Sequence, residues 1–181
     1  ADQQDFKDAQ RGLIARAPDA PIKNPAGRTV WHPGAYSFLE GESPDTVNPS
    51  LWRQAKLNNI RGLFKVKDGI YQLRGFDLAN MTLIDSDSGW IVVDPLTTVE
   101  TANSALNFAR KHLGNKIVKA VIFTHSHVDH FGGALGLLSK EELATRKANN
   151  DPLTVIAPSG FVEESVSELI VAGPAMTRRG V

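Results

Sequence analysis

Residues 124–130 read Thr-His-Ser-His-Val-Asp-His, and this stretch decides how the rest of the chain is interpreted. It holds three of the five histidines within six positions. Imidazole and carboxylate groups are ligands that suit zinc and similar divalent metals. Two neighbouring pairs, His125 with His127 and Asp129 with His130, can present ligands to two metals side by side. A surface loop that is polar by chance explains this density poorly, so we interpret the stretch as a metal-binding loop.

The neighbouring residues place this loop at the edge of a sheet. Residues 117–124 form an apolar run that predicts a strand inside a sheet, and ligands of open α/β sheets gather where such strands end. Alternate side chains of an extended segment share a face, so His125 and His127 can turn to the same side. The glycines at 132–133 allow the chain to curl, and we expect Phe131 to anchor the loop in the core.

The elements expected on either side of the loop define the fold class. Before it, hydrophobic alternation and turn residues predict two hairpins, and helical periodicity predicts an amphipathic helix. After it we expect a helix, a strand and a second helix. The expected ranges are strands 63–66, 70–73, 81–84, 90–93, 117–124 and 153–157, and helices 97–113, 132–138 and 161–171. This order favours an α/β fold with helices on the outer face of a sheet.

The first part of the chain has a different character. Residues 1–50 are rich in proline and glycine, which favours turns over regular elements. We expect them to form an extended arm, with a short helix within 2–17, laid over a body formed by residues 51–181. Regular structure in that body is expected to begin near Gly62. The arm's expected anchors are aromatic: Trp31, Tyr36, Phe38 and Trp52.

Composition excludes several functional classes. Lys plus Arg and Asp plus Glu are 20 each, and this zero net charge argues against a nucleic-acid partner. No apolar run approaches the roughly 20 residues of a membrane span. Because there is no cysteine, a metal must be held by His, Asp or Glu. The absence of cysteine and the start at Ala1 suit a periplasmic or secreted protein, although an engineered start explains Ala1 equally well.

The sequence THSHVDHFGG resembles the first metal motif of the metallo-β-lactamase superfamily. The resemblance implies a four-layer αβ/βα sandwich, of which this chain would be the N-terminal part, and a pair of zinc ions. It implies that His125 and His127 bind the first metal and that Asp129 and His130 bind the second. Asp129 is also the residue to which we assign a catalytic role.

The segments LNNIRGLFKVKDGIYQLRGFDLANMTLIDSDSGWIVVDPLTT and IAPSGFVEESVSELIVAGPAMTRR are similar to the alkylsulfatase branch of that superfamily. This narrower resemblance implies hydrolysis of a small alkyl sulfate to an alcohol and inorganic sulfate, in a homodimer. Two alternatives stay open. One is another hydrolase of the same fold, such as a lactonase, thioesterase, phosphodiesterase or β-lactamase. The other is a metal-binding or lipid-binding module without catalysis.

The ligand set expected from the resemblance is incomplete in this chain. The family adds further carboxylates and a histidine after the first motif, but no histidine follows His130. Glu163 and Glu164 fit the solvated first turn of a helix better than a metal site. We therefore expect the remaining ligands, a dimerisation domain and a lipid-transfer-like domain downstream of Val181.

Other polar residues have two interpretations each. Asp94 can orient a ligand histidine or cap the turn before Pro95, and both interpretations stay open. Asp77 and Asn80 lie in a loop between the hairpins, where a substrate role is the less favoured interpretation. Surface or helix-end roles are favoured for the remaining candidates, which are His32, His112, Arg178 and Arg179.

Overall fold

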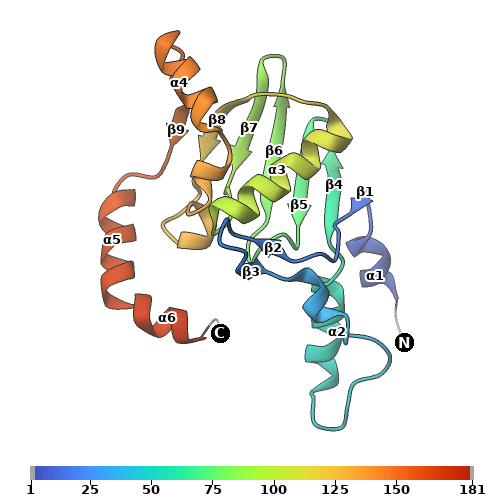
Figure 1. Ribbon diagram of the computed structural model, residues 1–181. Coiled ribbons are helices and arrows are strands. Elements are labelled where there is room, and N and C mark those ends of the chain that lie inside the picture. Colours follow the sequence, from blue (N-terminus) through green and yellow to red (C-terminus); the bar gives the residue numbers. More distant parts are fainter. Residues whose placement is uncertain (1–2, 180–181) are drawn as a thin grey trace.

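A seven-stranded sheet forms the centre of the computed structural model, which describes residues 3–179 (Figure 1). The strands lie in the order β1-β4-β5-β6-β7-β8-β9. Pairs from β1 to β7 are antiparallel, whereas β7 with β8 and β8 with β9 are parallel. Their bounds are β1 (Leu13–Arg16), β4 (Gly62–Lys67), β5 (Ile70–Arg74), β6 (Met81–Ser86), β7 (Gly89–Val93), β8 (Val118–Ile122) and β9 (Thr154–Ile156). Both predicted hairpins and both later strands are confirmed.

Helix α3 (Val99–Leu113) lies across one face of this sheet and forms the core with it (Figure 1). Thr98 and Thr101 exchange hydrogen bonds in a capping box that starts the helix. Ala102, Leu106 and Ala109 recur at helical spacing and are fully buried, as the periodicity predicts. Trp90 on β7 is the largest fully buried side chain of the core that α3 covers.

The N-terminal segment is more regular than we expected. It contains α1 (Gln4–Ala9), β1, the hairpin of β2 (Ile22–Lys23) and β3 (Thr29–Trp31) and a 3-10 turn (Pro33–Tyr36), and α2 (Pro49–Asn58) begins at its end. The expected start of regular structure near Gly62 was therefore wrong. Strand β1 extends the main sheet, because β4 supplies backbone partners that no local pattern reveals. The division of the chain at residue 50 stays a prediction.

The aromatic anchors differ from one another. The Trp31 indole donates a hydrogen bond to the Gly75 carbonyl oxygen at 3.1 Å and thereby ties β3 to the end of β5. Phe38 is 63% exposed and lies with its ring centroid 6.0 Å from that of Trp52. These two rings pack mainly on each other rather than in the core.

The segment after β8 departs from the expected helix at 132–138. The structure has two short 3-10 turns, at Val128–His130 and Ala134–Gly136, and a regular helix begins only at α4 (Lys140–Ala148). The expected helix was wrong because Gly133 and Gly136 pack directly on the backbone around α3. Ser139 and Glu142 form a capping box that starts α4 instead.

The last two helices, α5 (Phe161–Val171) and α6 (Gly173–Arg179), follow β9 and lie to one side of the sheet (Figure 1). The predicted range of α5 is confirmed. Most of its apolar side chains are nevertheless exposed, with Val162 at 68% and Ile170 at 73%. Among the helices of residues 3–179, none is long and apolar enough to cross a bilayer.

Candidate metal centre

The histidine-rich loop and Asp94 lie at the same edge of the sheet. Asp94 directly follows β7, and residues 124–130 follow β8. Because β7 and β8 are parallel, their carboxyl ends meet at one edge, so residues about 30 positions apart come together. The sequence predicted that the histidine-rich loop lies at the edge of a sheet, and Asp94 and the histidines do lie at such an edge.

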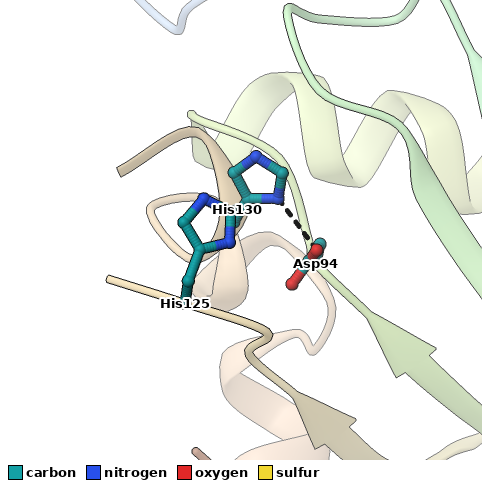
Figure 2. A group of neighbouring side chains, drawn as sticks. All are labelled: Asp94, His125 and His130. Atoms are coloured by element: carbon teal, nitrogen blue, oxygen red, sulfur yellow. Dashed lines mark hydrogen bonds and ion pairs between the residues drawn. The ribbon is translucent and has the colours of Figure 1, made fainter. Parts of the chain in front are cut away.

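Three of these side chains point toward one another (Figure 2). One ligand atom from each of Asp94, His125 and His130 lies within 4.8 Å of the others. The His125 ring centroid is 4.1 Å from that of His130 and 4.6 Å from that of His127. The fold thus brings the three predicted histidines together and adds a carboxylate to them.

Asp94 and Thr124 determine which ring nitrogens of two histidines carry a proton. The Thr124 hydroxyl donates to Asp94 Oδ2 at 2.7 Å, and His130 Nδ1 lies 2.8 Å from the same oxygen. A carboxylate only accepts, so His130 Nδ1 donates. The Thr124 hydroxyl uses its only hydrogen in the bond to Asp94, so it accepts a hydrogen bond from His125 Nδ1, at 2.9 Å. Both rings consequently keep the Nε2 lone pair for a metal.

The hydrogen bonds of Asp94 decide between its two interpretations. The residue is 8% exposed, and its Oδ1 also accepts from the Thr124 backbone N–H at 2.9 Å. Both oxygens are thus engaged by the segment that carries the histidines. We assign Asp94 to the orientation of His130 rather than to the capping of the turn before Pro95, in line with the first interpretation.

Asp129 and His130 have a separation that suits one shared ion. Asp129 Oδ2 lies 3.4 Å from His130 Nε2. Two donors on one tetrahedral zinc, with bonds of about 2.0–2.1 Å, lie about 3.3–3.4 Å apart. The donor set of imidazoles and a carboxylate, without thiolate, also suits zinc. The residues present therefore fit a divalent metal.

His127 is oriented differently from the other two histidines. Its side chain is 58% exposed, and its Nε2 lies 3.3 Å from Glu168 Oε1 on α5. To bind a metal through Nε2, His127 must first lose this contact with Glu168. Sequence reasoning considered Glu163 and Glu164, which are exposed, and missed Glu168. The available signal was helical spacing: Glu164 and Glu168 are four residues apart, and residues four apart lie on the same helix face.

The loop rests on the segment between β7 and α3 through two glycines. A Cβ on Gly133 would lie 2.2 Å from the Pro95 carbonyl oxygen, and one on Gly132 would lie 2.3 Å from that of Thr97. The Gly133 N–H donates to the Leu96 carbonyl oxygen at 2.8 Å. Glycine is therefore needed here for close backbone approach, as predicted.

Three aromatic rings hold the other side of the loop. Phe131 lies 6.0 Å from Phe123 at the end of β8 and 5.2 Å from Phe161 at the start of α5, measured between centroids. Phe123 and Phe161 stack at 5.3 Å. Phe131 thus anchors the loop as expected, although it is only half-buried.

The remaining candidates lie outside this group. His112 is exposed in the last turn of α3, with its ring 4.6 Å from Phe108. Arg178 is exposed and donates to the Pro174 carbonyl oxygen, and the side chain of Arg179 lies outside the described part of the structure. His32 belongs to the N-terminal segment, next to the 3-10 turn. Asp77 and Asn80 line a cavity of about 730 Å³.

Comparison with known proteins identifies the fold. Residues 74–158 match the family model described as the metallo-beta-lactamase superfamily. Over these residues the sequence is similar to that superfamily. The structure of the stereoselective inverting sec-alkylsulfatase Pisa1 from Pseudomonas sp. superposes with a TM-score of 0.87 at 53% identity, over 99% of this chain and 28% of that one. The expected α/β fold class is therefore confirmed.

Curated relatives show the same similarity. The chain is 51% identical over 181 residues to an (R)-specific secondary-alkylsulfatase of Pseudomonas sp.. It is 48% identical to a linear primary-alkylsulfatase of Pseudomonas sp. and 46% identical to an alkyl/aryl-sulfatase of Saccharomyces cerevisiae. Each match covers at least 98% of this chain but only 26–27% of the relative. The chain thus spans about a quarter of the length of these relatives.

Proposed function

We propose that the protein containing this chain is a zinc-dependent alkylsulfatase, which hydrolyses alkyl sulfate esters to an alcohol and inorganic sulfate. The observation that carries the proposal is the cluster of His125, His130 and Asp94 at the sheet edge. Identities of 46–51% to relatives named alkylsulfatases support the substrate class.

The proposed assignment of ligands follows the resemblance to the metallo-β-lactamase superfamily, and the hydrogen bonds of two histidines support it. His125 and His127 hold one metal, and Asp129 and His130 hold a second. Asp94 fixes His130 directly and His125 through the Thr124 hydroxyl, so both rings keep the same nitrogen available. A sulfate monoester is an anion that repels hydroxide, and bound divalent metals offset that charge and lower the pKa of water to about 7. We assign Asp129 as the catalytic residue, with a carboxylate oxygen that accepts a hydrogen bond from the attacking water.

Further parts of the proposal extend beyond the described residues. Because the relatives are about four times longer, we propose that the remaining metal ligands and the group that protonates the leaving alcohol come from another part of the protein. A homodimer and a periplasmic or secreted location complete the proposal. These two features are motivated by the alkylsulfatase resemblance and the absence of cysteine, respectively.

The activity is tested with the full-length, zinc-loaded protein. Dodecyl sulfate and a secondary alkyl sulfate are supplied, and released sulfate is measured. We expect His127→Ala to lose activity by on the order of 100-fold or more, because a ligand to a catalytic ion is removed. His112→Ala is the matched control, since it removes an exposed histidine from the far end of α3, and it should retain activity.

The same assay separates the alternatives. Equal activity of His127→Ala and the unmodified protein would contradict the proposed metal-dependent alkylsulfatase activity. Faster turnover of a lactone, thioester, phosphodiester or β-lactam would move the protein to another branch of the fold. Metal analysis of the 181-residue chain beside the full-length protein distinguishes an enzyme from a metal-binding module without catalysis.

A further inference from the structure

Asp77 is a buried carboxylate with a complete set of hydrogen-bond donors. It lies in the connection between β5 and β6 and is 7% exposed. Its Oδ2 accepts from the Thr97 N–H at 3.0 Å and from the Thr101 hydroxyl at 2.6 Å. Its Oδ1 accepts from the Thr97 hydroxyl at 2.8 Å and from the Leu78 N–H at 2.6 Å. Three of these four bonds reach the start of α3, where the helix dipole favours a negative charge.

The segment held by Asp77 has an unusual backbone. Residues 94–98 link β7 to α3, and two of them, Asp94 and Leu96, have φ angles of 54° and 66°. Residues other than glycine rarely adopt this left-handed conformation, and they keep it where the surroundings hold them in place. Asp77 helps to hold this segment in place, because it accepts hydrogen bonds from both the backbone N–H and the hydroxyl of Thr97.

The same segment carries the metal-binding loop on its other side. At one end, Asp94 bonds His130 and Thr124. In the middle, the Leu96 carbonyl oxygen accepts from the Gly133 N–H. A displacement of this segment therefore reaches His130 through Asp94, although Asp77 itself touches none of the proposed ligands.

We propose that Asp77 is a positioning residue for the metal centre, acting through residues 94–98 on the orientation of His130. The inference rests on the proposed metal-binding function. A carboxylate is required because each of its oxygens accepts from a backbone N–H, a group that can only donate. In Asp77→Asn, the NH₂ group would face one of these backbone N–H groups, donor against donor, and the backbone would have to move to relieve that conflict.

The test compares Asp77→Asn with Asp85→Asn in the full-length protein. Asp85 lies near the opposite end of the sheet, in an ion pair with Lys116, and serves as a control for the loss of a carboxylate. Zinc affinity is measured by competition with a chelator, and the absorption spectrum of the cobalt-substituted protein reports ligand geometry. We expect Asp77→Asn to bind zinc about 10–100-fold more weakly and to alter the cobalt spectrum. Asp85→Asn should match the unmodified protein in both measurements.

A second readout is independent of metal. The ¹⁵N shifts of His130 in the metal-free protein report which ring nitrogen carries the proton, and they should change in Asp77→Asn. If that variant fails to fold, Thr97→Val decides, because it removes one hydroxyl donor while it keeps the shape of the side chain. Thr97→Val should show smaller changes of the same kind in zinc affinity, in the cobalt spectrum and in the His130 shifts.

The outcomes are distinct. A lower melting temperature with unchanged zinc affinity, cobalt spectrum and His130 shifts would show a merely structural role and overturn the inference. Absence of metal binding by the unmodified full-length protein would overturn the proposed function itself. Normal binding by the unmodified protein and by Asp77→Asn alike would overturn only the role of Asp77.

Discussion

The protonation of single ring nitrogens is set by residues outside the predicted ligand set. Asp94 and Thr124 form a short chain of hydrogen bonds that reaches Nδ1 of both His130 and His125. Each ring is thereby fixed in orientation and in tautomer. The availability of Nε2 on both rings therefore depends on Asp94 and Thr124 as well as on the histidines.

Asp94→Asn tests this support. Its NH₂ group would replace an oxygen that accepts from His130, so His130 would have to move its proton to Nε2 and lose the lone pair meant for a metal. We expect zinc affinity to fall by about 10–100-fold, measured by competition with a chelator, while the circular dichroism spectrum stays the same. Unchanged affinity would contradict the assigned role.

The individual site residues could be predicted only in part. His125, His127, Asp129 and His130 were evident because they are close in sequence and chemically distinctive. Asp94 had two open interpretations, because its partner lies 36 positions away. Glu168 was missed because helical spacing shows which side chains share a helix face but not which loop that face will contact. A sequence shows local ligand spacing but not the contacts made by packing.

At the scale of elements, the site depends on how closely the metal-binding loop approaches the start of α3. Gly132 and Gly133 lie against carbonyl oxygens of residues 95–98. No side chain separates these two backbone segments, so the positions of the loop and the helix are coupled. The sheet supplies the edge, and this contact sets the position of the loop above it.

Gly133→Ala tests this coupling. Its Cβ would lie 2.2 Å from the Pro95 carbonyl oxygen and 2.6 Å from that of Thr98, so backbone must shift. We expect a loss of about 1–3 kcal/mol in the free energy of unfolding, measured by urea denaturation, together with weaker zinc binding. Gly173→Ala is the control, because its Cβ would meet nothing within 4 Å. Equal stability of the two variants would argue against close contact at Gly133.

Elements with strong local patterns were predicted correctly, and those without were not. The hairpins, α3 and α5 each combine clear periodicity with turn or capping residues. Strand β1 was missed because it has four residues and depends on β4, which is far away in sequence. The helix expected at 132–138 was wrong because the glycines there serve close packing rather than the start of a helix.

For the whole molecule, burial is uneven from one side of the sheet to the other. The middle strands carry fully buried side chains, among them Leu73, Leu83 and Val92. At the far edge, every residue of β9 is exposed, and α5 shows most of its apolar side chains to solvent. Stability is therefore expected to be concentrated in the centre of the sheet and in α3.

Hydrogen exchange on the 181-residue chain measures this distribution. Local opening costs least where few apolar side chains are buried. We expect amides of β5, β6 and β7 to exchange at least about tenfold more slowly than those of β9, α5 and α6. Equal protection of α5 and β7 would show that the exposed helix is held by contacts beyond those described.

The pairing of β1 with β4 has a consequence for the order of folding. Arg16 pairs with Gly62, so this contact closes a loop of roughly 45 residues, whereas β4 and β5 meet across a tight turn. Hairpins of local sequence form quickly, and contacts across long loops form later. During that interval, β4 is an open edge with free backbone donors and acceptors, a template on which another copy can pair. In the finished sheet, β1 occupies the outer edge of β4.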